Sequence, residues 1–210
     1  MIEEAEDFEI LKPVLGRILK EIQYLSGCES VAIRLYKDND FPYYLQVNFP
    51  DFFIVNENSL NVKEGDGSLL LDADGTPFVE CMCGNVLKRR FNPELRFFTE
   101  KGSFWTNSTT QLLSTLTESE RQQVGKTRNT CHNFGYESVA LVPLVGKEGN
   151  QGLIQINDPR ENMFTLGKIR QYELIAEHIS EVIDNLHKAT YQVFQIIDMV
   201  SKFKNVAVRS

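Results

Sequence analysis

The residues of this sequence best suited to binding or redox chemistry are four cysteines and one adjacent histidine: Cys28, Cys81, Cys83, Cys131 and His132. Three thiolates and one imidazole would suffice for a tetrahedral zinc site. The spacing argues against it, because the segment 77–90 has helical periodicity and residues two apart on a helix point about 200° away from each other. Cys81 and Cys83 would then face different ways, so we expect no stoichiometric metal.

The cysteines have three open interpretations. They are small buried core residues, ligands of a metal, haem or iron–sulfur cluster, or redox-sensing thiols. Four cysteines among 210 residues are too few for a disulfide framework. The sequence also lacks a P-loop, an HExxH helix and a GxSxG elbow. We therefore expect no catalytic residue, and the sequence leaves any cofactor unknown.

Polar and aromatic residues on expected strands are the other candidates for ligand contact. Arg34 lies on the strand face that points to a pocket or to solvent, and in a pocket it would pin an anionic group by a bidentate bond. Gln155 shares a strand face with Asn157. Trp105, with Asn107 nearby, would form an aromatic wall with polar neighbours, a composition that suits small-ligand sites. The alternative for Trp105 is an ordinary core position.

The first half of the chain reads as a helix followed by a hairpin. Apolar residues between 8 and 25 alternate spacings of three and four, which is typical of a helix with a heptad seam, and Gly27 ends it. The alternation in 29–37 and 43–47 predicts two paired strands. Residues 52–55 are expected to extend the sheet, and a loop follows.

The middle of the chain is expected to hold two short helices. Thr76 and Pro77 resemble an N-cap and first helical residue for a helix over 77–90. A second helix over 118–128 has the capping-box pattern of Thr117 and Glu120. Arg128, at its end, would either cap this helix or close a pocket.

The last part of the chain holds the clearest hairpin and a long helix. Segments 135–144 and 152–158 flank a glycine-containing turn and are expected at the sheet centre. From 166 to 203, apolar residues again alternate spacings of three and four, so that about 35 residues would span roughly 50 Å. Part of this helix should project from the domain, and the seam predicts a parallel homodimer.

Composition restricts the class of partner. The 42% hydrophobic and 24% charged residues are typical of one ordinary globular domain. A net charge of -7 disfavours nucleic acid and anionic membranes. The acidic N-terminus is unlike a signal peptide, and no run approaches the roughly 20 apolar residues of a membrane span. We expect a cytoplasmic protein.

Four motifs in order resemble one known family. They are ECMCGNV at 80–86, FFTEKGSFWTNSTT at 97–110, TRN-x-C at 127–131 and GYESVALVPL at 135–144. Together with the following glycine-leucine strand, an FT pair and the long helix, they resemble the GAF domains of PAS- and GAF-containing sensor histidine kinases of bacteria and archaea. The resemblance covers about residues 20 to 185.

The resemblance implies an α+β fold, with an antiparallel sheet that carries the terminal helices on one face and a ligand pocket on the other. Together with the two apolar seams, it divides the chain into a dimerisation helix over 1–26, a sensory domain over 27–185 and a helical extension over 186–210. It also implies a signalling role with a small-molecule ligand and a kinase or other output partner. The candidate ligand-binding residues are Arg34, Cys81, Trp105, Asn107, Cys131 and Gln155. The alternatives are a scaffold domain without ligand and a haem, iron–sulfur or thiol sensor that uses Cys81, Cys83 and Cys131.

Overall fold

The computed structural model describes residues 2–207, with the side chains of 11–193, 195 and 196 among them. Its centre is a five-stranded antiparallel sheet in the order β2-β1-β5-β4-β3. The strands are β1 (Ser30–Leu35), β2 (Tyr43–Val47), β3 (Phe104–Thr106), β4 (Ser138–Gly146) and β5 (Gly149–Asp158). Both predicted hairpins are confirmed, and β5 of the second hairpin is the central strand.

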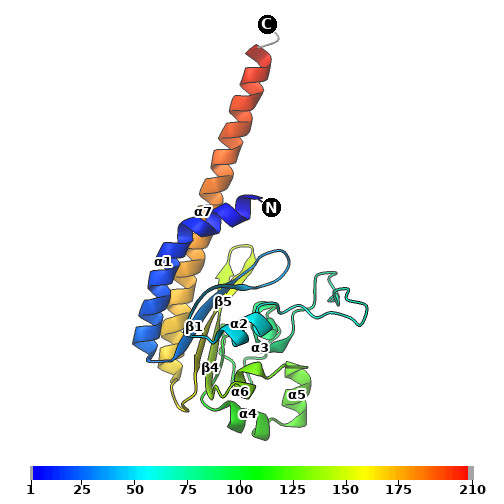
Figure 1. Ribbon diagram of the computed structural model, residues 1–210, viewed down its shortest axis with the longest axis vertical. Helices are drawn as coiled ribbons and strands as arrows, with labels where there is room; N and C mark the ends of the chain where they lie inside the picture. The colour runs from blue at the N-terminus through cyan, green and yellow to red at the C-terminus, as the bar shows by residue number, and fades with distance from the viewer. Residues whose placement is uncertain (1, 208–210) are drawn as a thin grey trace.

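The two faces of the sheet carry different layers (Figure 1). The register pairs Ile33 with Ile154, and these side chains belong to the core beneath the helices α1 (Ile2–Ser26) and α7 (Leu166–Ala207). Ala32 and Leu153 point the opposite way, into a second core. Period-two alternation of apolar residues thus builds one core on each face.

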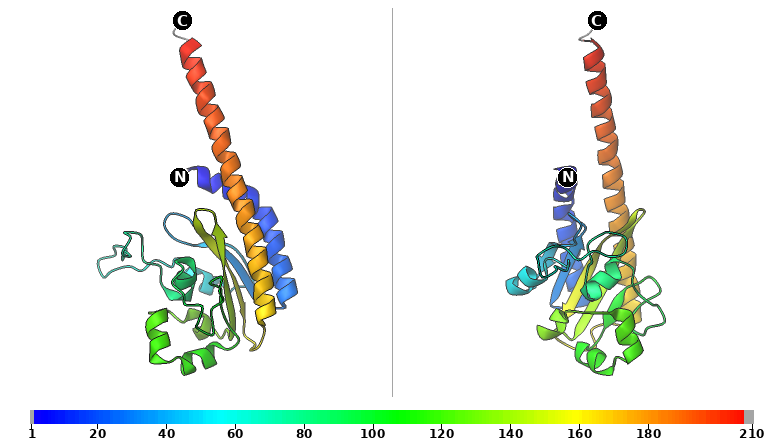
Figure 2. Two further views of the ribbon diagram at one scale, coloured as in Figure 1. Left: turned by 180° about the vertical axis from the view of Figure 1, so that it is seen from behind. Right: turned by 90° about the vertical axis from the view of Figure 1, so that its right-hand side faces the viewer.

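The terminal helices pack side by side on one face, and α7 continues well past the edge of the sheet (Figure 2). Gly27 ends α1 with a φ of 66°, and its N–H donates to the Gln23 carbonyl at 3.0 Å. Glycine takes this left-handed conformation without steric cost. The helix predicted from 166 is confirmed and extends over 42 residues.

Much of the predicted heptad seam faces the protein's own sheet. On α1 the seam residues Leu11, Leu15 and Ile22 are buried in the helix-side core, and on α7 so are Tyr172 and Ile179. Farther along α7 the seam is exposed at Val182, Val193 and Ile196. The seam side chains of Phe8, Val200 and Phe203 lie outside the described residues.

The second layer consists of short helices joined by loops: α2 (Asp51–Glu57), α3 (Cys81–Leu87), α4 (Thr109–Thr115), α5 (Glu118–Val124) and α6 (Thr130–Asn133). The capping box at the start of α5 is confirmed, since Thr117 Oγ1 accepts from the Glu120 N–H and the Glu120 side chain accepts from the Thr117 N–H. This helix ends earlier than predicted because Gly125 has a φ of 64°.

Two predicted elements in this layer are wrong. Residues 52–55 belong to α2 rather than to a strand, because Pro50 precedes the helix and the buried residues Phe53 and Glu57 lie one helical turn apart. The helix predicted over 77–90 is shorter, and Thr76 is no N-cap. Thr76 donates its hydroxyl to Asp74, and its neighbour Pro77 pairs with Leu71 in an extended arm over 61–79.

Among the described residues, no helix combines the length and the apolar character that crossing a membrane requires.

Candidate functional site

A cavity lies between the sheet face opposite α1 and α7 and the layer of short helices. Its volume is about 70 Å³, several times the ~10–15 Å³ that one water molecule needs. The lining includes eight aliphatic or aromatic side chains: Phe97, Phe104, Leu112, Leu113, Leu116, Val124, Val139 and Leu141. Such a wall favours an apolar ligand over an ion.

Sulfur atoms form one side of this cavity. Cys81, Met82 and Cys83 of α3 line it together with Cys131 of α6. The helical argument that would separate Cys81 from Cys83 does not hold, because Cys81 is the first residue of α3 and has a left-handed φ of 71°. Both cysteines therefore reach the same cavity.

The thiols around the cavity are held in the neutral form. Burial raises the pKa of Cys131 to about 12; the neighbouring Cys81 also raises it, while the amide of Asn157 and the charge of Arg34 lower it. Burial likewise raises the pKa of Cys83 well above its ordinary value. Because the thiolate is the nucleophile and the metal-binding form, these side chains are poorly reactive near neutral pH.

The five residues considered for zinc do not come together. Cys28 is buried on the helix side of the sheet, away from the cavity cysteines. His132 lines the cavity, and its Nδ1 lies 3.1 Å from the Thr109 hydroxyl. Across the described part of the chain, no three His, Cys, Asp or Glu side chains form a group suited to a metal ion.

Arg34 is fully buried on the cavity side of the sheet, and its two terminal nitrogens donate to the protein itself, while its Nε has no partner among the described residues. Nη1 donates to the Phe41 carbonyl at 2.8 Å, and Nη2 donates to the Glu57 carbonyl at 2.5 Å. The guanidinium also stacks on the Tyr43 ring, with its carbon 3.6 Å from the ring centroid. The two terminal nitrogens of Arg34 are therefore not available for the bidentate hydrogen bond to a ligand anion that the sequence suggested.

Arg34 and Trp105, both candidate ligand contacts from the sequence, do not share one cavity, because they lie on opposite faces of the sheet. In the three-residue strand β3, Phe104 points into the cavity, and Trp105 packs against the core beneath α1 and α7. Asn107 does not face the cavity either. Its amide ties β3 to the start of α7 through two bonds with the backbone of Phe164, at 2.9 and 2.8 Å.

Gln155 lies at the border between the cavity and a buried polar chain. As predicted, it shares a face with Asn157, and its Nε2 lies 3.4 Å from the Asn157 Oδ1. The same Nε2 donates to the Cys131 Sγ at 3.6 Å, and Gln155 Oε1 accepts from the Tyr43 hydroxyl at 2.9 Å. Asn157 is also fully buried, and its Nδ2 forms no hydrogen bond within the described residues.

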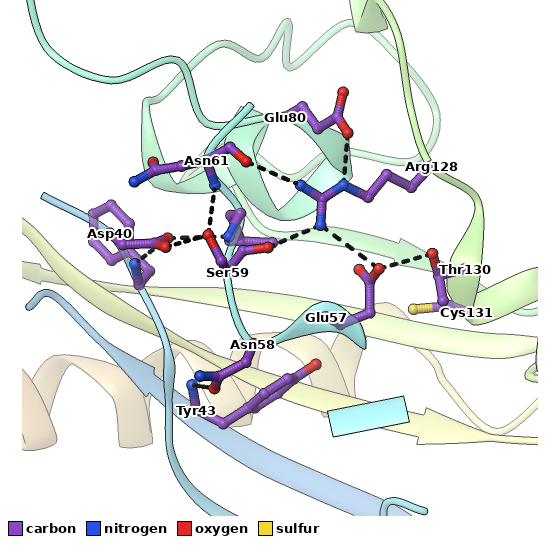
Figure 3. Close-up of polar contacts among 12 residues, drawn as sticks. Asp40, Tyr43, Glu57, Asn58, Ser59, Asn61, Glu80, Arg128, Thr130 and Cys131 are labelled. Atoms are coloured by element: carbon purple, nitrogen blue, oxygen red, sulfur yellow. Dashed lines mark hydrogen bonds and ion pairs between the residues drawn. The ribbon is translucent and has the colours of Figure 1, made fainter. Parts of the chain in front are cut away.

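Arg128 holds together three segments at the outside of the cavity (Figure 3). Its Nε donates to Glu80 at 2.6 Å, and its Nη1 lies 3.7 Å from Glu57 and 2.8 Å from the Ser59 carbonyl. It therefore caps no helix. No local pattern marks Glu57 and Glu80 in the sequence, because their partner is about 50 to 70 residues away along the chain.

The chain matches no known family model and no curated protein sequence. Solved structures do match. They include the GAF domain of PixJ from Thermosynechococcus elongatus in its blue-light absorbing form, at 14% identity and a TM-score of 0.55, over 93% of this chain and 95% of that one. A GAF domain region of a protein from Geobacter sulfurreducens PCA has 12% identity and a TM-score of 0.53, over 87% and 98%.

A domain described as part of a two-component sensor histidine kinase protein from Sinorhizobium meliloti 1021 also matches, at 11% identity and a TM-score of 0.55, over 87% of this chain and 97% of that one. Together with the sheet order and the helical layer on each face, these similarities show that the chain has the GAF-domain fold. The expectation of an α+β fold of this type is confirmed.

The raised thiol pKa values predict a loss of stability in alkali. In the unfolded chain Cys131 ionises near its ordinary value of 9.0, whereas in the folded protein its pKa is about 12. The stabilisation is complete below pH 9 and disappears as the pH rises from 9 to 12. We expect this residue to contribute a loss on the order of 1 kcal/mol in free energy of unfolding by pH 10.

Urea unfolding at pH 8 and pH 10 measures this loss. The matched variant is Cys131→Ser, whose hydroxyl does not ionise in this range, so its stability should fall less steeply than that of the wild type. Equal slopes for the two proteins would show that the Cys131 thiol is not shielded from ionisation.

Proposed function

We propose that this chain is a non-catalytic sensory GAF domain. It binds a small molecule in the cavity and passes its state through the terminal helices of a homodimer to an output partner, such as a kinase. The observation that carries the proposal is the cavity itself. A scaffold domain without ligand would fill this space with its own side chains, whereas here eight aliphatic and aromatic side chains line an open volume of about 70 Å³.

The ligand that fits this site is neutral and mostly apolar, with one hydrogen-bond acceptor. The terminal nitrogens of Arg34 are already engaged with backbone carbonyls, and the described residues that line the cavity include no lysine or arginine that could hold an anion. Behind Cys131, which lines the cavity, the Asn157 amide lies beside the thiol, and its buried Nδ2 has no hydrogen bond of normal geometry among the described residues. A buried donor without a partner is costly, and a ligand oxygen would satisfy it.

A direct structural route joins the cavity to α7. Phe97 and Phe104 line the cavity, and the turn between them carries Thr99 and Ser103. Both hydroxyls donate to the buried Glu173 on α7, at 2.5 and 2.7 Å. A ligand that displaces either phenylalanine would therefore act on the helix that projects from the domain.

The neutral thiols support a binding role over a catalytic or redox one. A nucleophilic or redox-sensing cysteine needs a lowered pKa, and here burial raises the pKa of Cys81, Cys83 and Cys131. A haem or iron–sulfur cluster would colour the purified protein. An absorption spectrum between 350 and 700 nm, roughly the range of such chromophores, checks this alternative directly.

Binding of two small aromatic probes tests the proposed ligand class. Acetophenone and ethylbenzene are similar in size, but only the ketone has an acceptor. We expect both to bind, and acetophenone to bind about three- to tenfold more tightly, because one net hydrogen bond contributes about 0.5–1.5 kcal/mol. Titrations followed by NMR chemical shifts of the cavity methyl groups would measure both affinities.

Two variants with a matched control complete the test. Leu112→Phe narrows the cavity and should abolish binding of both probes, whereas Leu174→Phe makes the same change at an exposed position of α7 and should leave binding intact. Asn157→Leu should remove the preference for acetophenone. If neither probe binds the wild type, or if Leu112→Phe binds both unchanged, the cavity is not the ligand site.

A further inference from the structure

A short strap, residues 125–129, joins α5 to α6 and forms part of the cavity wall. Thr127 and Asn129 of the strap line the cavity. The first and last strap residues have left-handed backbones, with a φ of 64° at Gly125 and 55° at Asn129. Such positions often absorb the backbone rotation when a segment moves.

The strap has few hydrogen bonds: the Thr127 hydroxyl donates to the Asn129 side chain at 2.8 Å, and the Arg128 N–H is directed at the Cys81 thiol of α3. Within the described chain, the N–H groups of residues 126–128 form no backbone–backbone hydrogen bond. Just before the strap, Asn85 Nδ2 donates to the Val124 carbonyl at 2.7 Å, which fixes α5 to α3. Just after it, Thr130 donates to Glu57 at 2.9 Å. Between these two anchors, Arg128 makes the strap's side-chain contacts to the neighbouring segments.

Arg128 connects the strap to two acidic side chains of low exposure. The exposed fractions are 21% for the Arg128 side chain, 13% for Glu80 and 8% for Glu57. These groups are partly shielded from water, so their attraction exceeds that of an ordinary surface pair. Glu80 also directly precedes Cys81, the residue with the left-handed φ that opens α3.

We propose that the strap 125–129 is the gate of the cavity and that Arg128 is its latch. When Arg128 releases Glu57, Glu80 and the Ser59 carbonyl, the strap swings on Gly125 and Asn129 and widens the path from solvent to the sulfur-lined side of the cavity. When the latch re-forms, this path narrows. Arg128 thus sets how fast small molecules enter and leave.

Alkylation of the cysteines by iodoacetamide tests the gate without any ligand. Cys83 and Cys131 report access to the cavity. Cys28 is an internal control, because it is buried with 4% exposure on the other face of the sheet and reacts only when the whole domain unfolds. Peptide mass spectrometry after timed quenching at pH 8 gives the rate at each cysteine.

In Arg128→Met we expect alkylation of Cys83 and Cys131 to accelerate about tenfold or more, since an ion-pair network of low exposure is lost, while Cys28 keeps its wild-type rate. Glu80→Gln, which removes one negative charge but keeps an acceptor oxygen and leaves Glu57 in place, should give a smaller increase with the same pattern. Arg121→Met removes an exposed arginine of the same layer, which donates to the Leu113 carbonyl, and should change none of the rates.

Two results would overturn the gate. The first is an unchanged rate at Cys83 and Cys131 in Arg128→Met. The second is a parallel rise at Cys28 in both Arg128→Met and Glu80→Gln, which would mean that the strap opens only with the whole domain. Neither result depends on the probe titrations, so the gate and the proposed ligand site can fail separately.

Discussion

Replacing Arg34 by methionine is expected to lower the free energy of unfolding by about 3–5 kcal/mol. The guanidinium is fully buried and lies on the Tyr43 ring. Its donors satisfy the carbonyl groups of Phe41, Glu57 and Asn58. Methionine fills part of the space but leaves these acceptors without donors, and each unsatisfied buried group costs about 1–3 kcal/mol.

Equilibrium unfolding in urea measures this effect, and Arg96→Met is the matched control. Arg96 is exposed and donates to the Thr115 hydroxyl, so its loss should change stability by no more than about 0.5 kcal/mol. If Arg34→Met also falls within that limit, the carbonyl contacts contribute little. Arg34 would then be available for a ligand anion after all, and the assignment of a neutral ligand would be wrong.

Arg34 also shows what the sequence could and could not reveal about the site. Alternation in β1 correctly placed its side chain opposite Val31, Ile33 and Leu35. It could not show that the space around the guanidinium is occupied by backbone carbonyls from residues 41, 57 and 58. Any residue type presents a carbonyl, so no pattern of side chains marks such a partner.

The fold was more predictable than the site, because its long elements repeat a local pattern. The hairpins and α7 rest on many alternating apolar residues. Short elements carry too little signal. Residues 52–55 are four apolar residues in a row, which suit a strand or a helix equally well. Pro50, which occupies the N-cap position, begins the helix α2 instead.

The misplacement of Trp105 has a related cause. Alternation within β3 shows that Phe104 and Trp105 point in opposite directions, but a strand of three residues does not show which of them faces the cavity. The pairing of Phe104 with Leu141 on β4 sets this choice. Leu141 itself faces the cavity, so Phe104 lies there and Trp105 packs beneath the helices.

The projecting part of α7 leads to a second prediction, which concerns the association of two copies of the chain. Val182, Val193 and Ile196 lie on one stripe of this helix and are 47%, 53% and 58% exposed. Ala189 continues the same alternation of three and four. A helix that lies on its own sheet needs no apolar stripe beyond the sheet edge, whereas two helices wrapped around each other do.

We therefore expect the chain to sediment as a dimer, with twice its mass of 24.1 kDa, and Val193→Glu to sediment as a monomer. Each buried Val or Ile of the stripe contributes roughly 1.5–3 kcal/mol of transfer free energy, and the stripe presents several such residues from each protomer. A glutamate at 193 would place two like charges, one from each protomer, in the middle of this contact. The dimer would lose the transfer free energy of the two valines, and it would gain the cost of desolvating two carboxylates that repel each other.

Gln195→Glu is the matched control for this substitution. It adds the same charge two residues later, where the side chain is also exposed but points about 200° away around the helix. This variant should remain dimeric in sedimentation velocity runs at micromolar concentration, with unchanged far-UV circular dichroism for both variants. A wild-type monomer, or a Val193→Glu protein that stays dimeric, would remove the terminal helices as the route from the cavity to an output partner. The signal would then have to leave through another surface of the domain.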